Sequence, residues 1–337
     1  MSHKIIIPIT LGFRGRYKLI RRKACDESIV QETAWSKNLI LFQGLDMIGA
    51  FDGGNNANNW LGGCVVGSGN TPPTQSDTSL ETFVAGTGTV QSVSDNRIAS
   101  PPSFVYTKTY RFGVGVAAGN LSEVGIARGA FNSTPNNSNP LFSRSLITDG
   151  MGNPITITVL GDKYLDVIYE LTRLLPATDV TGTFSLNILG TPTNHDYVIR
   201  PAFITSGGIA APWKMAGGSG IGYAPAALAA KPNSISQVPN GDSGATNGSL
   251  GVSTSLPTGT SSAFTATQIT AAYVPGNYYK DLTFVAGLND GNLAGGISCL
   301  LFNINLGPMQ MSLNPVIDKN ASRIFDITIR VGFADAS

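Results

Sequence analysis

The chain has 337 residues, of which 42% are hydrophobic and only 13% are charged, about half the charged fraction of a typical soluble protein. Its net charge of +1 provides no long-range field that would gather nucleic acid or an anionic membrane, so we expect neither as a partner. No apolar run approaches the roughly 18 residues of a membrane span, and the opening MSHKIIIPIT is too short for a signal sequence. We therefore expect a soluble protein made in a cytoplasm.

Glycine and proline punctuate the whole chain. The 40 glycines and 19 prolines leave no room for an uninterrupted helix beyond about 12–15 residues, so we expect mostly strands and turns. The three cysteines, Cys25, Cys64 and Cys299, fit neither a disulfide framework nor a metal knuckle. We expect them to be buried free thiols.

The first 80 residues predict short strands and one helix. Strands are expected at KLIRRK (18–23), WSKNLILF (35–42) and LGGCVVG (61–67), and a helix at QGLDMIGAF (43–51). Turns or loops are expected at GFRGR (12–16), GGNNANN (53–59) and the Pro-stiffened SGNTPPTQSDTSL (68–80). These assignments follow the change from alternating apolar residues to Gly, Pro and Asn clusters.

The middle of the chain predicts a β-meander. Alternating or apolar segments occur at SFVYTKTYRF (103–112), NLSEVGIA (120–127), LFSRSLI (141–147), ITITVL (155–160) and YLDVIYEL (164–171). Turn signals such as DGMGNP (149–154) separate them. Strands about 8–12 residues apart with such turns are typical of a sandwich or jelly roll.

The composition changes again between residues 206 and 262, which are rich in Gly, Ala and Ser and almost uncharged. We expect a long loop excursion there, because few large apolar residues are present to form a core. Strands resume at YYKDLTFVAGL (278–288), ISCLLFNI (297–304) and RIFDITIRVGFA (323–334). In the last of these, Phe325, Ile327, Ile329 and Val331 should form the buried face.

The predicted fold class is therefore all-β, an antiparallel sandwich or jelly-roll-like fold with a long Gly/Ser/Ala-rich loop excursion. We divide the chain into an N-terminal strand and attachment segment (1–60), a β-sandwich portion (61–205), the excursion (206–262) and C-terminal strands that complete the fold (263–337).

Residues for catalysis are scarce, and we predict no catalytic, cofactor-binding or metal-ligating residue. His3 lies near the chain start and His195 is interpreted as a turn residue, so Ser–His or Cys–His chemistry lacks a base. The segment 113–118 resembles a dinucleotide fingerprint, but no helix-like stretch follows it, and a turn is favoured. Asp162, Asp166 and Glu170 would share one solvated strand face; a glycan-cleaving enzyme built on them remains a minor alternative.

Two sets of residues are candidates for binding. A basic cluster could dock on an acidic partner or could simply solvate a strand edge; it comprises Arg14, Arg16, Lys18, Arg21, Arg22 and Lys23. In YVPGNYYK (273–280), aromatic rings and an amide could contact a glycan, although the same residues are ordinary turn and strand material. These are Tyr273, Asn277, Tyr278 and Tyr279.

Several blocks, in consistent order over nearly the whole chain, resemble a recurrent family of phage and prophage collar or tail-fibre-type structural proteins. They are NLILFQGLDMIGAF (38–51), CVVGSGNTPPTQSDTSL (64–80), YRFGVGVAAGNLSEVGIA (110–127), LFSRSLITDGMGNPITITVLGDKYLDVIYEL (141–171) and GPMQMSLNPVIDKNASRIFDITIRVGFA (307–334). The chain ends in RVGFADAS, where many relatives place a Trp and a basic residue. The resemblance brings no catalytic residues.

The resemblance implies a virion structural protein, made in the cytoplasm of a bacterial host and located at the collar, neck or tail. Homo-oligomers, with a trimer favoured, and other phage virion proteins are its expected partners. The alternative function is a receptor-binding or glycan-binding tail-fibre adhesin. We further expect the segment up to residue 51 to face the particle and the excursion to face outward or lie between copies.

Overall fold

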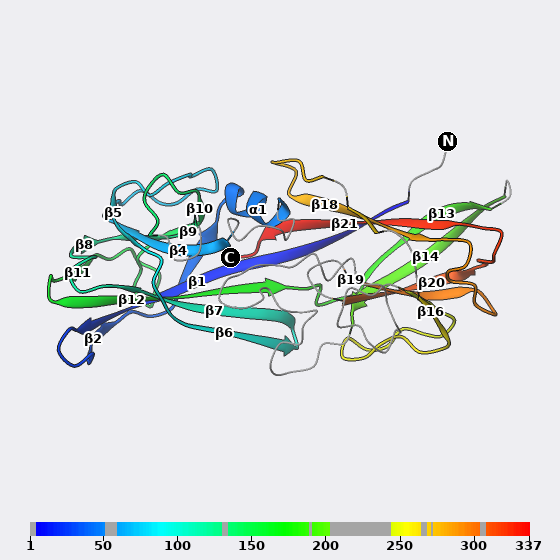
Figure 1. Ribbon diagram of the computed structural model, residues 1–337, viewed down its shortest axis with the longest axis horizontal. Coiled ribbons are helices and arrows are strands. Elements are labelled where there is room, and N and C mark those ends of the chain that lie inside the picture. Colours follow the sequence, from blue (N-terminus) through cyan, green and yellow to red (C-terminus); the bar gives the residue numbers. More distant parts are fainter. Residues whose placement is uncertain are drawn as a thin grey trace.

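The computed structural model of the chain is an elongated molecule built almost entirely from β-strands (Figure 1). It describes residues 5–50, 59–129, 134–188, 191–202, 244–263, 268–270, 272–303 and 308–337. One short helix, α1 (Phe42–Gly49), lies among the described elements, where the sequence predicted it. Its buried side packs against the strands around Phe142, whose carbonyl accepts a hydrogen bond from the Leu41 amide at 3.1 Å.

The strands of the described residues form a large sheet of 13 strands, a smaller sheet of six and a two-stranded ribbon. The large sheet contains β1 (Ile6–Lys23), β2 (Ile29–Glu32), β3 (Ser36–Ile40), β4 (Asn59–Gly67), β5 (Phe83–Thr87), β6 (Val90–Ala99), β7 (Pro102–Phe112), β9 (Glu123–Gly129), β10 (Leu141–Leu146), β12 (Lys163–Leu174), β17 (Gln268–Thr270), β18 (Tyr279–Ala286) and β21 (Phe325–Asp335). The ribbon pairs β8 (Gly119–Leu121) with β11 (Ile157–Val159).

Strand β1 is the central element of the large sheet. Along one edge it pairs antiparallel with β12, from Gly12 opposite Leu174 to Lys23 opposite Lys163. Along the other edge it pairs in turn with β21, β3 and β2. The pairing of β1 with β21 is parallel, so the first and last described strands lie side by side (Figure 1).

Alternation decides which face of the large sheet is buried. In β1 the odd-numbered residues from Ile7 to Tyr17 are buried, whereas even-numbered residues such as Arg14 and Arg16 face outward. In β21 the buried residues include Phe325, Ile327, Ile329 and Val331, as the sequence predicted. Side chains of successive strand residues point to opposite faces, so these patterns place one apolar face against a core and leave the other polar.

The large sheet curls so that β4, β9 and β10 cover the inner face of β1, β7 and β12. The Tyr17 hydroxyl donates to the Leu146 carbonyl at 2.6 Å, and the Tyr110 hydroxyl donates to the Leu61 carbonyl at 2.7 Å. Trp60 stacks on Phe142 at the edge of this core, with ring centroids 6.2 Å apart. The curled sheet thus forms a sandwich with itself.

The six-stranded sheet forms the other end of the molecule (Figure 1). Its order is β13 (Val180–Ile188), β14 (Thr191–Pro201), β20 (Pro308–Ile317), β19 (Ile297–Asn303), β15 (Gly244–Thr246) and β16 (Ser261–Ala263). Phe302 of β19 meets Phe284 of β18 with centroids 5.6 Å apart, which joins the core of this sheet to that of the large sheet. The predicted all-β, sandwich-like class is confirmed.

Several local predictions differ from the structure. GFRGR is not a turn, because Gly12 and Gly15 lie within β1 and leave its pairing with β12 uninterrupted. Strands β6, β13, β14 and β20 were not predicted, because polar residues and prolines interrupt their apolar pattern. His195 is not in a turn: it lies in β14 and is buried.

The expected excursion is described only in part. Residues 203–243 lie outside the described residues. Residues 244–263 carry β15 and β16, and β15 pairs with β19, so this stretch extends the six-stranded sheet. Strand pairing therefore reaches into a region that has few large apolar residues.

An unexpected cation lies in the core of the curled sheet. Lys108 of β7 is only 3% exposed, and its Nζ atom donates to the Leu61 carbonyl at 2.6 Å. The Nζ atom also lies 5.0 Å from the ring centroid of Tyr110. Burial disfavours the charged amine and lowers the pKa of Lys108 to about 8.

This buried amine predicts a pH-dependent stability difference between the wild type and Lys108→Met. The folded-state pKa of about 8 lies below the unfolded value of about 10.4, so between these values the unfolded chain binds more protons and the wild type gains stability as pH rises. We expect Lys108→Met to be the more stable protein at pH 7. The gap should narrow by about 2 kcal/mol between pH 7 and pH 9.5.

Chemical denaturation of both proteins at pH 7, 8, 9 and 9.5 measures this gap. Other groups that titrate in this range, such as the buried Cys64 thiol and the core tyrosines, are present in both proteins and cancel in the difference. A gap that is independent of pH would contradict the assignment.

Candidate functional site

The six basic residues of the predicted docking surface all belong to β1, and three of them face outward at its centre. Arg14, Arg16 and Lys18 alternate with buried residues on the outer face of the large sheet. The residue skipped at the register shift between Arg21 and Arg22 is Val30 of β2, so β1 keeps its alternation and Arg21 and Lys23 fall on the opposite face. The cluster therefore forms a strip along one strand.

Neighbouring carboxylates neutralise part of this strip. Arg16 makes a two-pronged ion pair with Glu170 of β12, at 2.6 and 2.8 Å. Lys18 pairs with Glu32 of β2. Arg21 donates to the Thr158 carbonyl. The exposed residues Arg14 and Lys23 have no carboxylate partner within the described part of the chain.

Trp35 covers the middle of the strip. The Arg16 guanidinium lies 4.5 Å from the centroid of the Trp35 ring, and the Lys18 ammonium lies 5.5 Å from it. The indole remains 38% exposed. An exposed aromatic ring flanked by cations is a common feature of protein interfaces, so Trp35 extends the candidate docking surface beyond the residues that the sequence suggested.

The predicted carboxylate row is not a solvated face. Asp166 is 2% exposed and lies between two guanidinium groups, with Arg22 Nε at 2.8 Å and Arg111 Nε at 2.7 Å. The hydrogen bond to Asp166 raises the pKa of Arg111. Glu170 is also buried, whereas Asp162 lies in a turn and pairs with Lys163. Asp166 and Glu170 therefore hold the strands β1, β7 and β12 together through ion pairs.

The four predicted glycan contacts divide into two groups. The Tyr273 hydroxyl donates to Asp46 of α1 at 2.5 Å, and burial together with this carboxylate raises the pKa of Tyr273. Tyr278 stacks on Phe42 at the start of the helix, with centroids 5.4 Å apart. Asn277 is exposed in the connecting turn. These three residues thus form a small surface with one end of α1.

Tyr279 lies elsewhere, on the outer face of the large sheet. Its ring lies 3.9 Å from the guanidinium carbon of Arg330, which makes two hydrogen bonds with Asp281. Arg330 is opposite Pro8 of β1. Pro8 and Arg14 are six positions apart on the same face, about 20 Å along the strand. The structure therefore places Tyr279 and the basic strip on one surface.

Most of the remaining candidates from the sequence are packed against neighbouring residues or lie in turns. His195 Nδ1 lies 2.7 Å from the Pro315 carbonyl and the ring stacks on Phe184, while His3 lies outside the described residues. Cys64 and Cys299 are buried as predicted, but Cys25 is exposed in the turn after β1. Residues 113–118 connect β7 and β8 as a turn.

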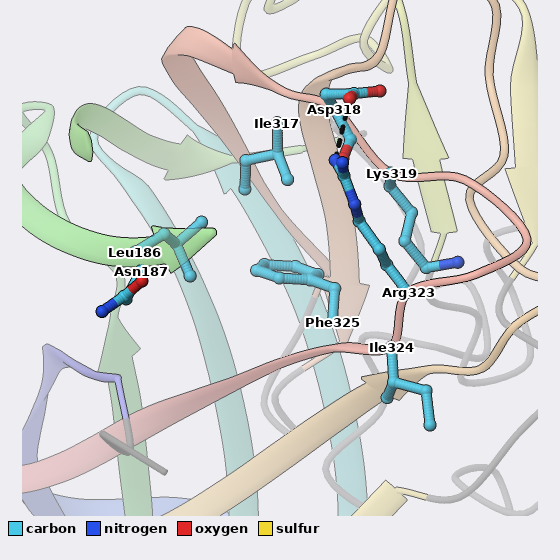
Figure 2. A pocket seen from close by; sticks show the side chains of 8 residues that line it. All are labelled: Leu186, Asn187, Ile317, Asp318, Lys319, Arg323, Ile324 and Phe325. Atoms are coloured by element: carbon cyan, nitrogen blue, oxygen red, sulfur yellow. Dashed lines mark hydrogen bonds and ion pairs between the residues drawn. The ribbon is translucent and has the colours of Figure 1, made fainter. Parts of the chain in front are cut away.

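An open pocket of about 240 Å³ lies at the mouth between the two sheets (Figure 2). Leu186, Ile317 and Phe325 form its apolar walls, while Asp318 and Arg323 pair at the rim at 2.8 Å. Lys319 beside them donates to Asn292 at 2.9 Å. This lining suits an apolar group and holds no pair of facing carboxylates.

A buried charge network that the sequence did not indicate fixes the connection between β4 and β5. Glu123 is fully buried, and its carboxylate accepts hydrogen bonds from the backbone amides of Gly69 at 3.1 Å and Thr82 at 2.8 Å. Arg144 of β10 pairs with Glu123 at 2.9 Å and also with Asp77. A lone Glu in NLSEVGIA carries no sequence signal of this role, because its partners lie between 21 and 54 residues away along the chain.

Comparison of the chain with known protein families, characterised proteins and solved structures gives no match. Within the described residues, no helix is long and apolar enough to cross a membrane. The same residues contain no group of three or more His, Cys, Asp or Glu side chains arranged to hold a metal ion.

The Glu123 network predicts a large difference between buried and exposed ion pairs. Glu123→Ala leaves Arg144 partly unpaired in the interior and removes the acceptor of three loop amides, so we expect a loss of about 3–5 kcal/mol in unfolding free energy. Asp318→Ala breaks a pair whose carboxylate is 74% exposed and should cost about 0–1 kcal/mol. Urea denaturation measures both.

Limited proteolysis of the same variants shows which segment of the chain is destabilised. Glu123→Ala should open cleavage within residues 68–82, whereas Asp318→Ala should not. Equal stabilities of the two variants would contradict a structural role for the network.

Proposed function

We propose that this chain is a structural subunit of a bacteriophage virion, located at the collar, neck or tail and assembled with copies of itself and with other virion proteins. The observation that carries the proposal is the outer face of the large sheet, which is open along β1 within the described residues. On β1 this face exposes Ile6, Pro8, Thr10 and Arg14 in succession within the described structure. A sheet of this length with one open face is suited to packing against another protein.

The internal ion pairs support a structural role. Asp166, Glu170 and Glu123 each hold two or more strands or loops together. Such groups stabilise the geometry of the subunit, and the few charges left free set how a partner approaches. The ordered resemblance of five sequence blocks to collar and tail-fibre-type proteins agrees with this reading.

The ion pairs decide which basic residues can be reversed in a test of docking. Reversing Arg16 or Arg22 would place two carboxylates against each other at Glu170 or Asp166, so a loss of assembly could result from misfolding. Arg14, Lys23 and Lys37 are exposed and have no ion pair within the described structure. They are the appropriate residues for a charge reversal.

We expect the triple variant Arg14→Glu, Lys23→Glu, Lys37→Glu to fold normally and to enter particles about tenfold less efficiently, since three exposed pairs together contribute about 1–2 kcal/mol. The decrease relative to the wild type should be smaller at high salt, where ions screen both the wild-type attraction and the repulsion that the glutamates introduce. Quantitative immunoblotting of purified particles measures incorporation, and circular dichroism checks the fold.

The variant with glutamine at the same three positions is the matched control and should show a smaller decrease. Cryo-electron microscopy of the wild-type particle locates the subunit directly. A chain that is missing from purified particles would contradict the proposed function, whereas normal incorporation of the charge-reversed variant would contradict only the docking surface.

The alternative function, a receptor-binding or glycan-binding adhesin, is favoured by one observation. Phe42 is 39% exposed and stacks on Tyr278 beside the exposed Asn277, which offers a sugar both an aromatic surface and an amide. On this reading Tyr278→Ala abolishes binding of the isolated protein to host cells. Tyr279→Ala, on the other face and stacked on Arg330, should leave binding unchanged, as measured by flow cytometry with labelled protein.

A further inference from the structure

Six strands form the edges of the two larger sheets in the described structure, and four of them are short. Strands β2, β5, β16 and β17 have between three and five residues each. Short edge strands offer few free backbone groups, and natural proteins use them to prevent unwanted pairing. The two long edges, β6 with ten residues and β13 with nine, are therefore the candidates for pairing with another chain.

Strand β6 carries features that protect an edge. Its register against β7 shifts between Val90 and Ser92, and its sequence contains Asp95 and Arg97. Bulges and charges both oppose the addition of a further strand. Strand β13 has neither, because VTGTFSLNI contains no charge and no proline and its pairing with β14 is regular throughout.

Side chains on the inner face of β13 pack against side chains of β14. The Phe184 ring stacks on His195 at 5.5 Å and on Tyr197 at 6.3 Å. Gly182 accommodates the Tyr197 side chain, since an added Cβ atom would lie 2.4 Å from the Tyr197 hydroxyl. The outer-face residues Thr181, Thr183, Ser185 and Asn187 are exposed. A fixed backbone with exposed polar side chains is a preformed template for another strand.

We propose that β13 pairs antiparallel with β13 of a second copy of this chain about a two-fold axis, so that the two six-stranded sheets become continuous. The strand is complementary to itself in this arrangement. With Phe184 opposite its counterpart, each Leu186 faces a Gly182 and lies beside the Tyr197 ring that covers this glycine. Each Ser185 then faces a Thr183, and cross-strand hydroxyl pairs of this kind stabilise sheets.

Electrostatics also permit this contact. The nearest outer-face charge, Asp196, accepts a hydrogen bond from Thr183 at 2.6 Å and lies one strand further from the edge. The two Asp196 residues of a pair are then about three strand spacings, or about 14 Å, apart. This distance exceeds the Debye length of about 8 Å at physiological salt, so their repulsion is small.

The position of β13 makes the contact compatible with docking of the subunit on a particle. Strand β13 lies at one end of the elongated molecule, whereas β2 and the adjoining end of β1 lie at the other (Figure 1). The inference deepens the proposed structural role by naming a self-association surface. A two-fold contact produces pairs, so a trimer would need a separate interface.

Ser185→Lys tests the contact. The residue is exposed, so the subunit should fold, but the paired arrangement brings two like charges within about 7 Å. We expect the wild type to be dimeric and the variant to associate at least tenfold more weakly, as measured by sedimentation equilibrium over a range of concentrations. Ser94→Lys on β6 is the matched control, equally an exposed serine on a long edge strand, and should remain dimeric.

Crosslinking provides an independent measurement. In a Cys25→Ser background the remaining cysteines, Cys64 and Cys299, are buried. Ser185→Cys should then be joined between copies by a short bismaleimide, because the two residues 185 are diagonal neighbours about 7–8 Å apart, and Ser94→Cys should not. A monomeric wild type, a dimer that Ser185→Lys leaves intact, or crosslinking through position 94 would each overturn the proposal.

These outcomes are separable from the proposed function, because immunoblotting of purified particles decides the virion role independently. Presence in particles together with a monomeric wild type would reject only the β13 contact. A dimer that depends on β13 but is absent from particles would reject only the virion role.

Discussion

The backbone pairing of β1 is the interaction on which the rest of the structure depends. Along one edge β1 bonds to β12 over Gly12–Lys23, and along the other it bonds first to the C-terminal strand β21 and then to β3 and β2. Each of these strands except β2 pairs with further strands, so β1 sets the position of the curled sheet. It also positions β12 and β21, which are connected along the chain to the six-stranded sheet. The pairing of β1 with β21 joins segments about 320 residues apart in the sequence.

The low charge of the chain has a structural consequence. Several of its few carboxylates, among them Asp166, Glu170 and Glu123, are buried against guanidinium groups. Buried ion pairs contribute little net stability compared with apolar packing, but removing one partner is costly. The network therefore favours a single strand arrangement over alternatives, and it leaves only a few free cations, such as Arg14, on the outer face. Free charge is thus concentrated where a partner would approach.

Faces and edges of the sheets have different roles in this molecule. The outer face of the large sheet is polar and partly open, with aromatic rings at Trp35 and Tyr279 flanked by cations. Most edges are short or interrupted, whereas β13 is long, regular and uncharged. Side-chain contacts on a face and backbone contacts at an edge can act together without competing for the same residues. The proposed docking surface on the face and the proposed β13 contact at the edge therefore use different residues.

The sequence by itself determined the all-β class, the single short helix and the buried face of β21, because hydrophobic alternation and turn residues act over a few positions. It could not show that GFRGR continues a strand, since the regular pairing of β1 with β12 overrides the local preference of Gly12 and Gly15. Nor could it show that His195 is buried or that Asp166 bridges Arg22 and Arg111. Those outcomes depend on strand register between segments up to about 150 residues apart, and only the tertiary structure decides which side chains such pairing brings together.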